Sequence, residues 1–389
     1  MMPITGYLKS RTLVRYCLLC LNMSTRPNTI FTSEGLCPAC SQYVSPESID
    51  WSERESQLEE IKEFGRKNSS SGYDCIVGVS GGKDSTLQAL FVRDNLGMNP
   101  LLVSLNYPPN QISDMGARNI SNLINLGFDC INIGCSPTIW KNLMKAAFYE
   151  FGNWAKSTEM ALFSSVPRLA ISFQIPLIWW GENAAVMLGD MKMAGKNASD
   201  GNRLKYSNTL NGGDITWMYS LGYKGNQLIQ YQYPSDADMA RANLRIVFIA
   251  HFWRDFTPFT NGNIAALRGI NIRTPDPQNA DCWGTSMLDE DFYILNMMMK
   301  WLKFGFGKAS DNINEEIRAG RISRDEGIKV VEQFDGKCPP HVIEAFCNYI
   351  GISIKEFWIV VDRFVNKDLF TKLSQGNYQK KFKVGENLD

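Results

Sequence analysis

A short glycine-rich loop combines the residue types that bind a phosphate group. It lies within residues 73–90, which read YDCIVGVSGGKDSTLQAL. Its glycines can adopt positive φ without steric cost, so successive backbone N–H groups can turn toward one anion, and its serines and lysine add donors and charge. An apolar run precedes the loop and a helical pattern follows it, so a helix dipole would favour the same anion. The predicted phosphate-binding residues are Ser80, Gly81, Gly82, Lys83, Asp84 and Ser85.

The loop differs from a Walker A motif, which needs a glycine six residues before a Lys-Ser/Thr pair. Here Asp84 follows Lys83, and position 77 is Val77. The string SGGKDS instead resembles the PP-loop of the ATP pyrophosphatase superfamily, whose members cut ATP between the α and β phosphates. This resemblance implies an adenine nucleotide alpha hydrolase-like fold, with ATP as substrate, Lys83 and Asp84 as catalytic residues, and Mg2+ with Asp84 as a candidate ligand. A glycine-serine turn that binds nothing is the alternative.

Four cysteines near the start of the chain have the spacing of a structural zinc site, C-x2-C-x16-C-x2-C. Each C-x2-C pair can direct two thiolates at one metal ion, and four thiolates leave no coordination position open for chemistry. We therefore predict a structural Zn2+ site, with four unrelated buried cysteines as the alternative. The predicted ligands are Cys17, Cys20, Cys37 and Cys40.

Charge and composition restrict the class of protein. Forty basic and forty acidic residues give no net charge, so the chain lacks the basic excess of a nucleic-acid-binding protein. No apolar run approaches the roughly 18 residues of a membrane span, and residues 1–10 lack the apolar core of a signal peptide. Ten cysteines in a chain of this length indicate reduced thiols and metal ligation. We expect a cytoplasmic protein without nucleic-acid or membrane partners.

The middle of the chain alternates between strand and helix patterns, which predicts a parallel α/β sheet with ligands at the carboxyl ends of its strands. Strands are predicted at residues 75–79, 101–105, 128–133 and 176–180, and helices at 85–95, 115–126 and 138–151. The predicted organisation is a zinc-binding module at 1–50, a linker helix at 51–72, a PP-loop domain at 73–300 and a helical carboxy-terminal region at 301–389. Glu182 and Asn183 follow the last predicted strand and are candidate substrate-binding residues, although a plain polar turn has the same pattern.

Several later segments leave their roles open. Residues 195–225 are rich in Gly and Asn and too long for an ordinary connection, so they predict a lid or a disordered loop. The aromatic-rich stretch 231–258 could line a pocket or pack as an amphipathic surface. Capping-box patterns at Ser323 and Ser353 predict two helix starts. Lys308 and Arg318, in a basic segment punctuated by glycines, are predicted to approach the phosphate loop beside Glu182 and Asn183, with Arg318 as an anion clamp; a surface charge network is the alternative.

The cysteine module, VSGGKDS, GEN at residues 181–183 and KFGFGKASDNINEEIRAGRISRDEG at 303–327 occur together. In this combination the chain resembles the N-acetyl sugar amidotransferase family, which amidinates N-acetyl groups for bacterial O-antigen and flagellar glycans. The resemblance implies an N-acetylated sugar substrate, nucleotide-linked or a nonulosonic acid. It also implies an O-adenylyl imidate attacked by ammonia, and separate glutaminase and barrel-type ammonia-channel subunits as partners.

Two other functions remain open at this point. A PP-loop tRNA-thiolating enzyme also joins such loops to CxxC modules, but the remaining six cysteines form no CxxC pair. The second alternative is a zinc-bearing nucleotide-binding module that regulates a partner. Retention of the complete phosphate-binding loop argues against it. A glutaminase within this chain is not expected, because a cysteine nucleophile needs a basic partner and the only histidines are His251 and His341.

Overall fold

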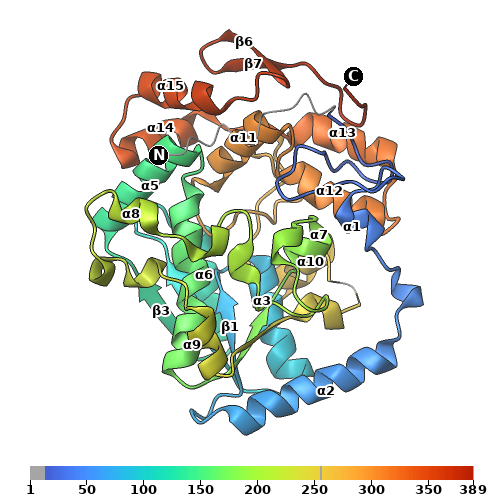
Figure 1. Cartoon of the computed structure of the whole chain (residues 1–389), viewed down its shortest axis with the longest axis vertical. Helices are drawn as coiled ribbons and strands as arrows, with labels where there is room; N and C mark the ends of the chain where they lie inside the picture. The colour runs from blue at the N-terminus through green and yellow to red at the C-terminus, as the bar shows by residue number, and fades with distance from the viewer. Residues whose placement is uncertain (1–13, 255, 389) are drawn as a thin grey trace.

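The computed structural model describes residues 14–254 and 256–388 and is built around a five-stranded parallel sheet (Figure 1). The strand order is β3-β2-β1-β4-β5, so the direction of connection reverses between β1 and β4. The α/β fold class and the four predicted strands are confirmed, and a fifth strand lies in the aromatic-rich stretch. The strands are β1 (Cys75–Val79), β2 (Pro100–Asn106), β3 (Cys130–Gly134), β4 (Leu177–Trp180) and β5 (Arg245–Phe248).

Alternate residues of the strands face two different helical layers. Val77 and Val79 of β1 pack in an apolar cluster with α2, α3, α4 and α10, whereas Ile76 packs with α6 and α9. Burial on both faces explains the almost continuous apolar sequence of the central strands. The helices of the two layers are α2 (Trp51–Asn68), α3 (Lys83–Leu90), α4 (Asp114–Asn125), α10 (Pro258–Leu267), α6 (Ala155–Ser172) and α9 (Asp236–Arg241).

The carboxy-terminal region contains five helices, which pack with α5 (Pro137–Phe151) in a second large core. At α13, Ser323 and Glu326 form both halves of the predicted capping box. At α15, Ser353 accepts from the Glu356 backbone N–H, while the Glu356 carboxylate accepts from the Tyr149 hydroxyl. The helices are α11 (Tyr293–Phe304), α12 (Lys308–Arg318), α13 (Arg324–Phe334), α14 (Pro340–Ile350) and α15 (Ile354–Phe364).

The chain does not end as a purely helical region. An antiparallel hairpin follows α15, formed by β6 (Phe370–Ser374) and β7 (Asn377–Lys380). Its turn contains Gly376 at φ 74°, a conformation that glycine adopts without steric cost. The helical expectation therefore missed this hairpin, because its strands are short and largely exposed and show little apolar periodicity.

The cysteine-containing segment packs against α12 and α13 rather than standing apart (Figure 1). Its buried cysteines belong to the same apolar core as Phe306 and Ile313, and the short helix α1 (Pro38–Ser41) carries the last of them. Among the described residues, no helix is both long and apolar enough to cross a membrane.

The segment 195–225 is ordered. Backbone hydrogen bonds join Gly201 N–H to the Ile246 carbonyl and Phe248 N–H to the Ser199 carbonyl, both at 2.8 Å, so residues 199–201 lie along β5. The alternative of a disordered loop is therefore wrong. Its short helical turns are η5 (Leu204–Tyr206), η6 (Asn211–Gly213) and α8 (Thr216–Tyr219).

Candidate functional site

The glycine-rich loop follows β1, the central strand, and leads directly into α3. Gly81 has φ 82°, and a Cβ there would lie 2.8 Å from the Gly116 carbonyl oxygen, so both conformation and space require glycine. The Ser80 N–H donates to Ser85 Oγ at 3.3 Å, which closes the loop on the first turn of the helix. Because α3 begins at Lys83, its amino-terminal N–H groups lie beside the loop.

Lys83 and Asp84 form a partly buried ion pair at the start of α3. Lys83 Nζ lies 2.5 Å from Asp84 Oδ2, and Asn261 Nδ2 donates to Asp84 Oδ1 at 2.6 Å. Burial lowers the pKa of the Lys83 ammonium, but Asp84 and then Glu182 raise it, and the net shift is upward. The ammonium is therefore charged and held at the loop.

A cavity of about 560 Å3 opens at the carboxyl ends of β1, β2 and β4, where the strand order reverses. This is the position at which open α/β sheets bind their ligands. Among the predicted site residues, the cavity is lined by Ser80, Gly82, Asp84, Ser85, Glu182 and Lys308. Lys83 lies behind this wall, in contact with Asp84.

Glu182 and Asn183 have different roles at the end of β4. Glu182 is exposed to the cavity, but many protein atoms surround its carboxylate. The resulting desolvation and then the Asp84 carboxylate raise the pKa of Glu182, while Lys83 and Lys308 lower it. Asn183 instead caps α7 (Ala184–Met187): its Oδ1 accepts from Ala185 N–H and its Nδ2 donates to the Ala198 carbonyl. Glu182 thus faces the ligand space, and Asn183 shapes the turn beside it.

Lys308 and Arg318 stand at opposite ends of α12 and are not brought together. Lys308 lines the cavity, and the start of its helix is fixed by Asp335, which accepts from Gly307 N–H at 2.8 Å and Ala309 N–H at 2.9 Å. Arg318 is buried, is not among the residues that line the cavity, and donates to the Met187 carbonyl at 2.6 Å. Of the two, Lys308 has the position of a ligand-binding residue, and an anion clamp at Arg318 stays a prediction.

Three further cations in the cavity wall were not assigned from the sequence. Lys300 and Lys303 project from α11, and Arg26 comes from the loop between the two cysteine pairs. Burial lowers the pKa of Lys303 to about 8. The basic character of residues 301–327 could have indicated Lys303 as a ligand-binding residue. No sequence signal indicated Arg26, because it is a single arginine in a polar loop.

Glu159 of α6 is a carboxylate in the cavity wall that sequence reasoning also missed. Burial raises its pKa to about 7, although Thr209, Lys156 and Lys300 act in the opposite direction. A carboxyl group that titrates near neutral pH can accept or donate a proton during a reaction. No sequence signal marks it, since it is a single glutamate in a long helix and belongs to no motif.

The four predicted zinc ligands form one buried cluster. Their sulfur atoms all lie within 4.8 Å of one another, and Cys20 Sγ and Cys37 Sγ are 3.8 Å apart. A tetrahedral site with Zn–S bonds of about 2.3 Å has sulfur atoms about 3.8 Å apart, so the donor set fits Zn2+. Backbone N–H groups of Asn22 and Cys37 donate to Cys20 and Cys17 sulfurs, as expected where thiolates bind a metal.

The sheet order, the SGGKDS loop after the central strand and the cavity at the switch point define a PP-loop α/β protein. Residues 285–385 match the model of a family described as "LPS biosynthesis protein WbpG-like, C-terminal domain". The match agrees with the resemblance to a family of bacterial surface-glycan biosynthesis.

Two other comparisons add little to this assignment. No curated protein matches the chain. Among solved structures, the chain is similar to an NH3-dependent NAD synthetase from Campylobacter jejuni subsp. jejuni NCTC 11168 in complex with the nitrate ion, with 15% identity and a TM-score of 0.28. That match covers 59% of this chain and 99% of the other.

Proposed function

We propose that this chain is an ATP-dependent amidotransferase of bacterial surface-glycan biosynthesis, which converts a sugar N-acetyl group to an acetamidino group. The observation that supports it most strongly is that one cavity is lined by both the PP-loop and the carboxy-terminal region. Asp84 and Ser85 come from the loop, and Lys300 and Lys308 lie in the segment that matches the WbpG-like domain. ATP and a second substrate could therefore meet in one space.

The reaction must activate an amide, because its carbonyl is a weak electrophile and its oxygen a poor leaving group. In the proposed sequence the amide oxygen attacks the α-phosphorus of ATP, and pyrophosphate departs. Ammonia then adds to the imidate carbon, AMP leaves with the former amide oxygen, and the acetamidino group remains. The nitrogen loses a proton on the way to products, and Glu159 or Glu182 in the cavity wall could accept it.

The residues of the loop would act on the charge that develops on the phosphates. The loop N–H groups and Ser85 would bind pyrophosphate as it forms, and the charge of Lys83 behind them would stabilise it. These interactions lower the barrier only if they strengthen in the transition state. Mg2+, when bound, would neutralise the phosphates, and Asp84 is the loop carboxylate that faces the cavity. The four-cysteine site would hold Zn2+ in a structural role.

The test is to incubate the purified protein with ATP, Mg2+, an ammonium salt and a panel of nucleotide-linked N-acetyl sugars and nonulosonic acids. Mass spectrometry should find one sugar in which an oxygen is replaced by NH, with AMP and pyrophosphate formed in equal amounts. Release of ADP and phosphate, or AMP formation without any modified sugar across the panel, would contradict the proposal.

A tRNA-thiolating enzyme is less compatible with the cavity. Among the described residues that line it there is no cysteine, and Cys75 in β1 is fully buried with its pKa raised by that burial. A thiolating mechanism would place a reactive thiol or an iron-sulfur cluster at this point. Incubation with unmodified tRNA, ATP and a sulfide donor tests this alternative directly, and thiolated tRNA would favour it.

A regulatory nucleotide-binding module is the remaining alternative. It would bind ATP without turnover, so release of pyrophosphate in the presence of the sugar separates it from an enzyme. The paired and charged Lys83 and Asp84 at the loop favour catalysis, because simple binding does not require both groups.

A further inference from the structure

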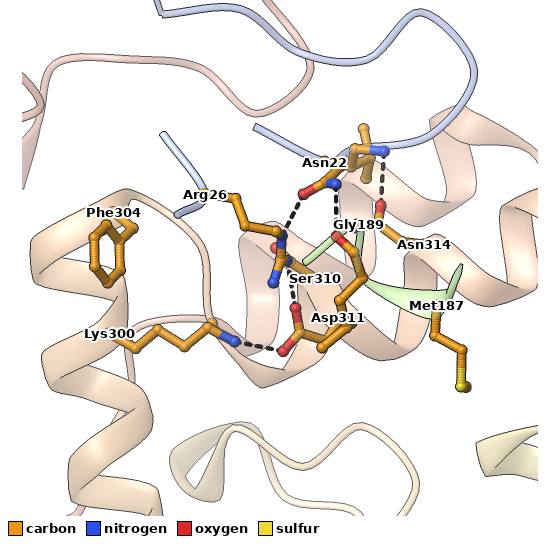
Figure 2. Close-up of polar contacts among 12 residues, drawn as sticks. Asn22, Arg26, Met187, Gly189, Lys300, Phe304, Ser310, Asp311 and Asn314 are labelled. Atoms are coloured by element: carbon orange, nitrogen blue, oxygen red, sulfur yellow. Dashed lines mark hydrogen bonds and ion pairs between the residues drawn. The ribbon is translucent and has the colours of Figure 1, made fainter. Parts of the chain in front are cut away.

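The loop formed by residues 21–29 connects the cysteine cluster directly to the cavity wall. The loop begins directly after Cys20. The Leu21 N–H donates to Asn314 Oδ1 of α12 at 2.7 Å, and Asn22 Nδ2 donates to the Leu188 carbonyl at 3.3 Å (Figure 2). Further along, Thr29 Oγ1 donates to the Gly189 carbonyl at 3.2 Å. The loop therefore joins α12 to the turn after α7.

Arg26 is the residue of this loop that carries a charge into the cavity wall. Its Nε donates to Asn22 Oδ1 at 2.6 Å, and its Nη2 lies 2.5 Å from Asp311 Oδ1 (Figure 2). The guanidinium stacks over the Phe306 ring with its Cζ 4.1 Å from the centroid. Arg26 is 8% exposed, and that exposure is in the cavity wall.

Asp311 holds several cations of the cavity in place. Its second oxygen pairs with Lys300, and Lys308 lies near enough to act on it. Burial raises the pKa of Asp311, but Lys300, Arg26 and Lys308 together hold it below the usual range, so the carboxylate is charged. Asp311 and Asp84 of the phosphate loop both act to raise the pKa of Glu182. Arg26 therefore pairs with a carboxylate whose charge acts on Glu182, which lines the same cavity as the phosphate loop.

We propose that residues 21–29 couple metal binding at the four cysteines to the geometry of the cavity, with Arg26 as the positioning residue. The metal orders the chain on both sides of this loop, and the ordered loop places Arg26 on Asp311. Loss of the metal would release Arg26, so that Asp311 keeps an ion pair with Lys300 only. Lys300 and Lys308 would then shift. Such coupling is reciprocal, so a ligand in the cavity would also stabilise the metal site. The inference uses the proposed function only in taking the cavity as the ATP site.

Hydrogen-deuterium exchange of the full chain, with its metal and after treatment with a chelator, tests the coupling without an activity assay. Removal of the metal should speed exchange in residues 21–29 and also at the start of α12, residues 308–314. Helix α9, which packs in a different apolar cluster from the cysteines, is an internal reference that should not change. If faster exchange is confined to residues 14–44, the proposal is overturned.

Two variants separate Arg26 from the general stability of the module. Arg26→Met should speed exchange at residues 308–314 in the metal-loaded protein and weaken ATP binding about fivefold or more, and Arg26→Lys should recover part of both. Arg324→Met is the matched control, since Arg324 donates to the Cys20 carbonyl but is not among the residues that line the cavity. It should leave ATP affinity within about twofold of wild type.

The reverse direction gives a third readout. ATP should slow the transfer of Zn2+ to a chromophoric chelator several-fold in the wild type, and Arg26→Met should remove this effect. Equal transfer rates with and without ATP, together with measurable ATP binding, would overturn the coupling. If the wild type binds no ATP at all, the proposed function fails, while the exchange experiment still decides the coupling.

Discussion

At the scale of single residues, the ion pair of Lys83 and Asp84 is the feature most closely tied to the proposed chemistry. Lys83 is 6% exposed, so its charge depends on its carboxylate partners. Removal of Asp84 would leave a buried ammonium, and Glu182 is the carboxylate with the next largest effect on its pKa. A conservative substitution is therefore needed to separate catalysis from folding.

Asp84→Asn should lower the rate of pyrophosphate release by about 100-fold or more while the fold is retained, because the amide can keep its contact with Asn261 but removes the charge from the cavity. The matched control is Asp114→Asn, at an exposed position in the first turn of α4. Circular dichroism and a pyrophosphate-release assay measure both properties. A folded Asp84→Asn variant with wild-type activity would remove Asp84 from the mechanism.

Glu290 makes a separate prediction about pH and stability. It is buried, its Oε2 accepts from Gln111 Nε2 at 3.0 Å and Phe292 N–H at 2.8 Å, and burial raises its pKa to about 8. In the unfolded chain the pKa of a glutamate is about 4.3. The folded state therefore binds the proton more tightly, and the free energy of unfolding falls as pH rises between these two values.

Glu290→Gln removes this titration and keeps an oxygen acceptor for both contacts. Its melting temperature relative to wild type should rise as pH increases from about 5 to about 8 and then level off. The control is Glu344→Gln, at an exposed position on α14. Thermal denaturation across this range measures the difference, and parallel pH curves for Glu290→Gln and wild type would contradict a raised pKa.

At the scale of elements, the turn from β1 into α3 is fixed by backbone geometry rather than by side chains. Gly81 has positive φ and is pressed against Gly116, which is itself pressed against the Asp289 backbone, since a Cβ on Gly116 would lie 2.5 Å from the Asp289 carbonyl oxygen. Three segments distant in sequence thus converge behind the loop. The shape of the phosphate site depends on this contact.

Gly81→Ala should destabilise the protein by about 1–3 kcal/mol and reduce ATP affinity, because it adds both strain and a clash. Gly72→Ala is a matched control: Gly72 also has positive φ, at 89°, but no atom lies within 4 Å of an added Cβ. It should show the backbone cost of about 1 kcal/mol without any loss of ATP binding. Equal stability of the two variants, with ATP affinity retained in both, would show that the contact with Gly116 is unimportant.

At the scale of the whole molecule, the source of ammonia is the main open element of the proposed function. A glutaminase needs a cysteine nucleophile with a basic partner. His251 lies edge-on to Phe252, and burial together with Arg54 lowers its pKa to about 4. His341 lies in the first turn of α14. Neither histidine is in the wall of the cavity.

We predict that the purified chain uses ammonium salts but does not hydrolyse glutamine, and that a separate glutaminase with a barrel-type channel subunit delivers ammonia. The amination rate with an ammonium salt should rise with pH toward the pKa of ammonium, because free ammonia is the nucleophile. The measurement is product formation with each nitrogen source, with glutamate release as the control for hydrolysis. Glutamate formation by the chain alone would contradict this division between subunits.

The amino-acid sequence by itself determined the features that contiguous residues encode. The loop at residues 80–85, the strand before it and the two cysteine pairs each depend on spacing within one short segment, and local geometry follows from that spacing. Of the first four strands, β1, β2 and β4 were recognisable because the inner strands of a parallel sheet are almost uniformly apolar, whereas β3 lies at the sheet edge and is only partly buried.

Only the tertiary structure decided which distant groups meet. Arg26 and Asp311 are 285 positions apart, and neither has a local signal, yet together with Lys300 they form one wall of the cavity. The tertiary structure also showed that Lys308 lines the cavity, whereas Arg318 does not and instead donates to the Met187 carbonyl. Both outcomes depend on how α12 packs against the cysteine module and α11. Such packing arises from the sum of many weak contacts across the chain, which no local pattern records.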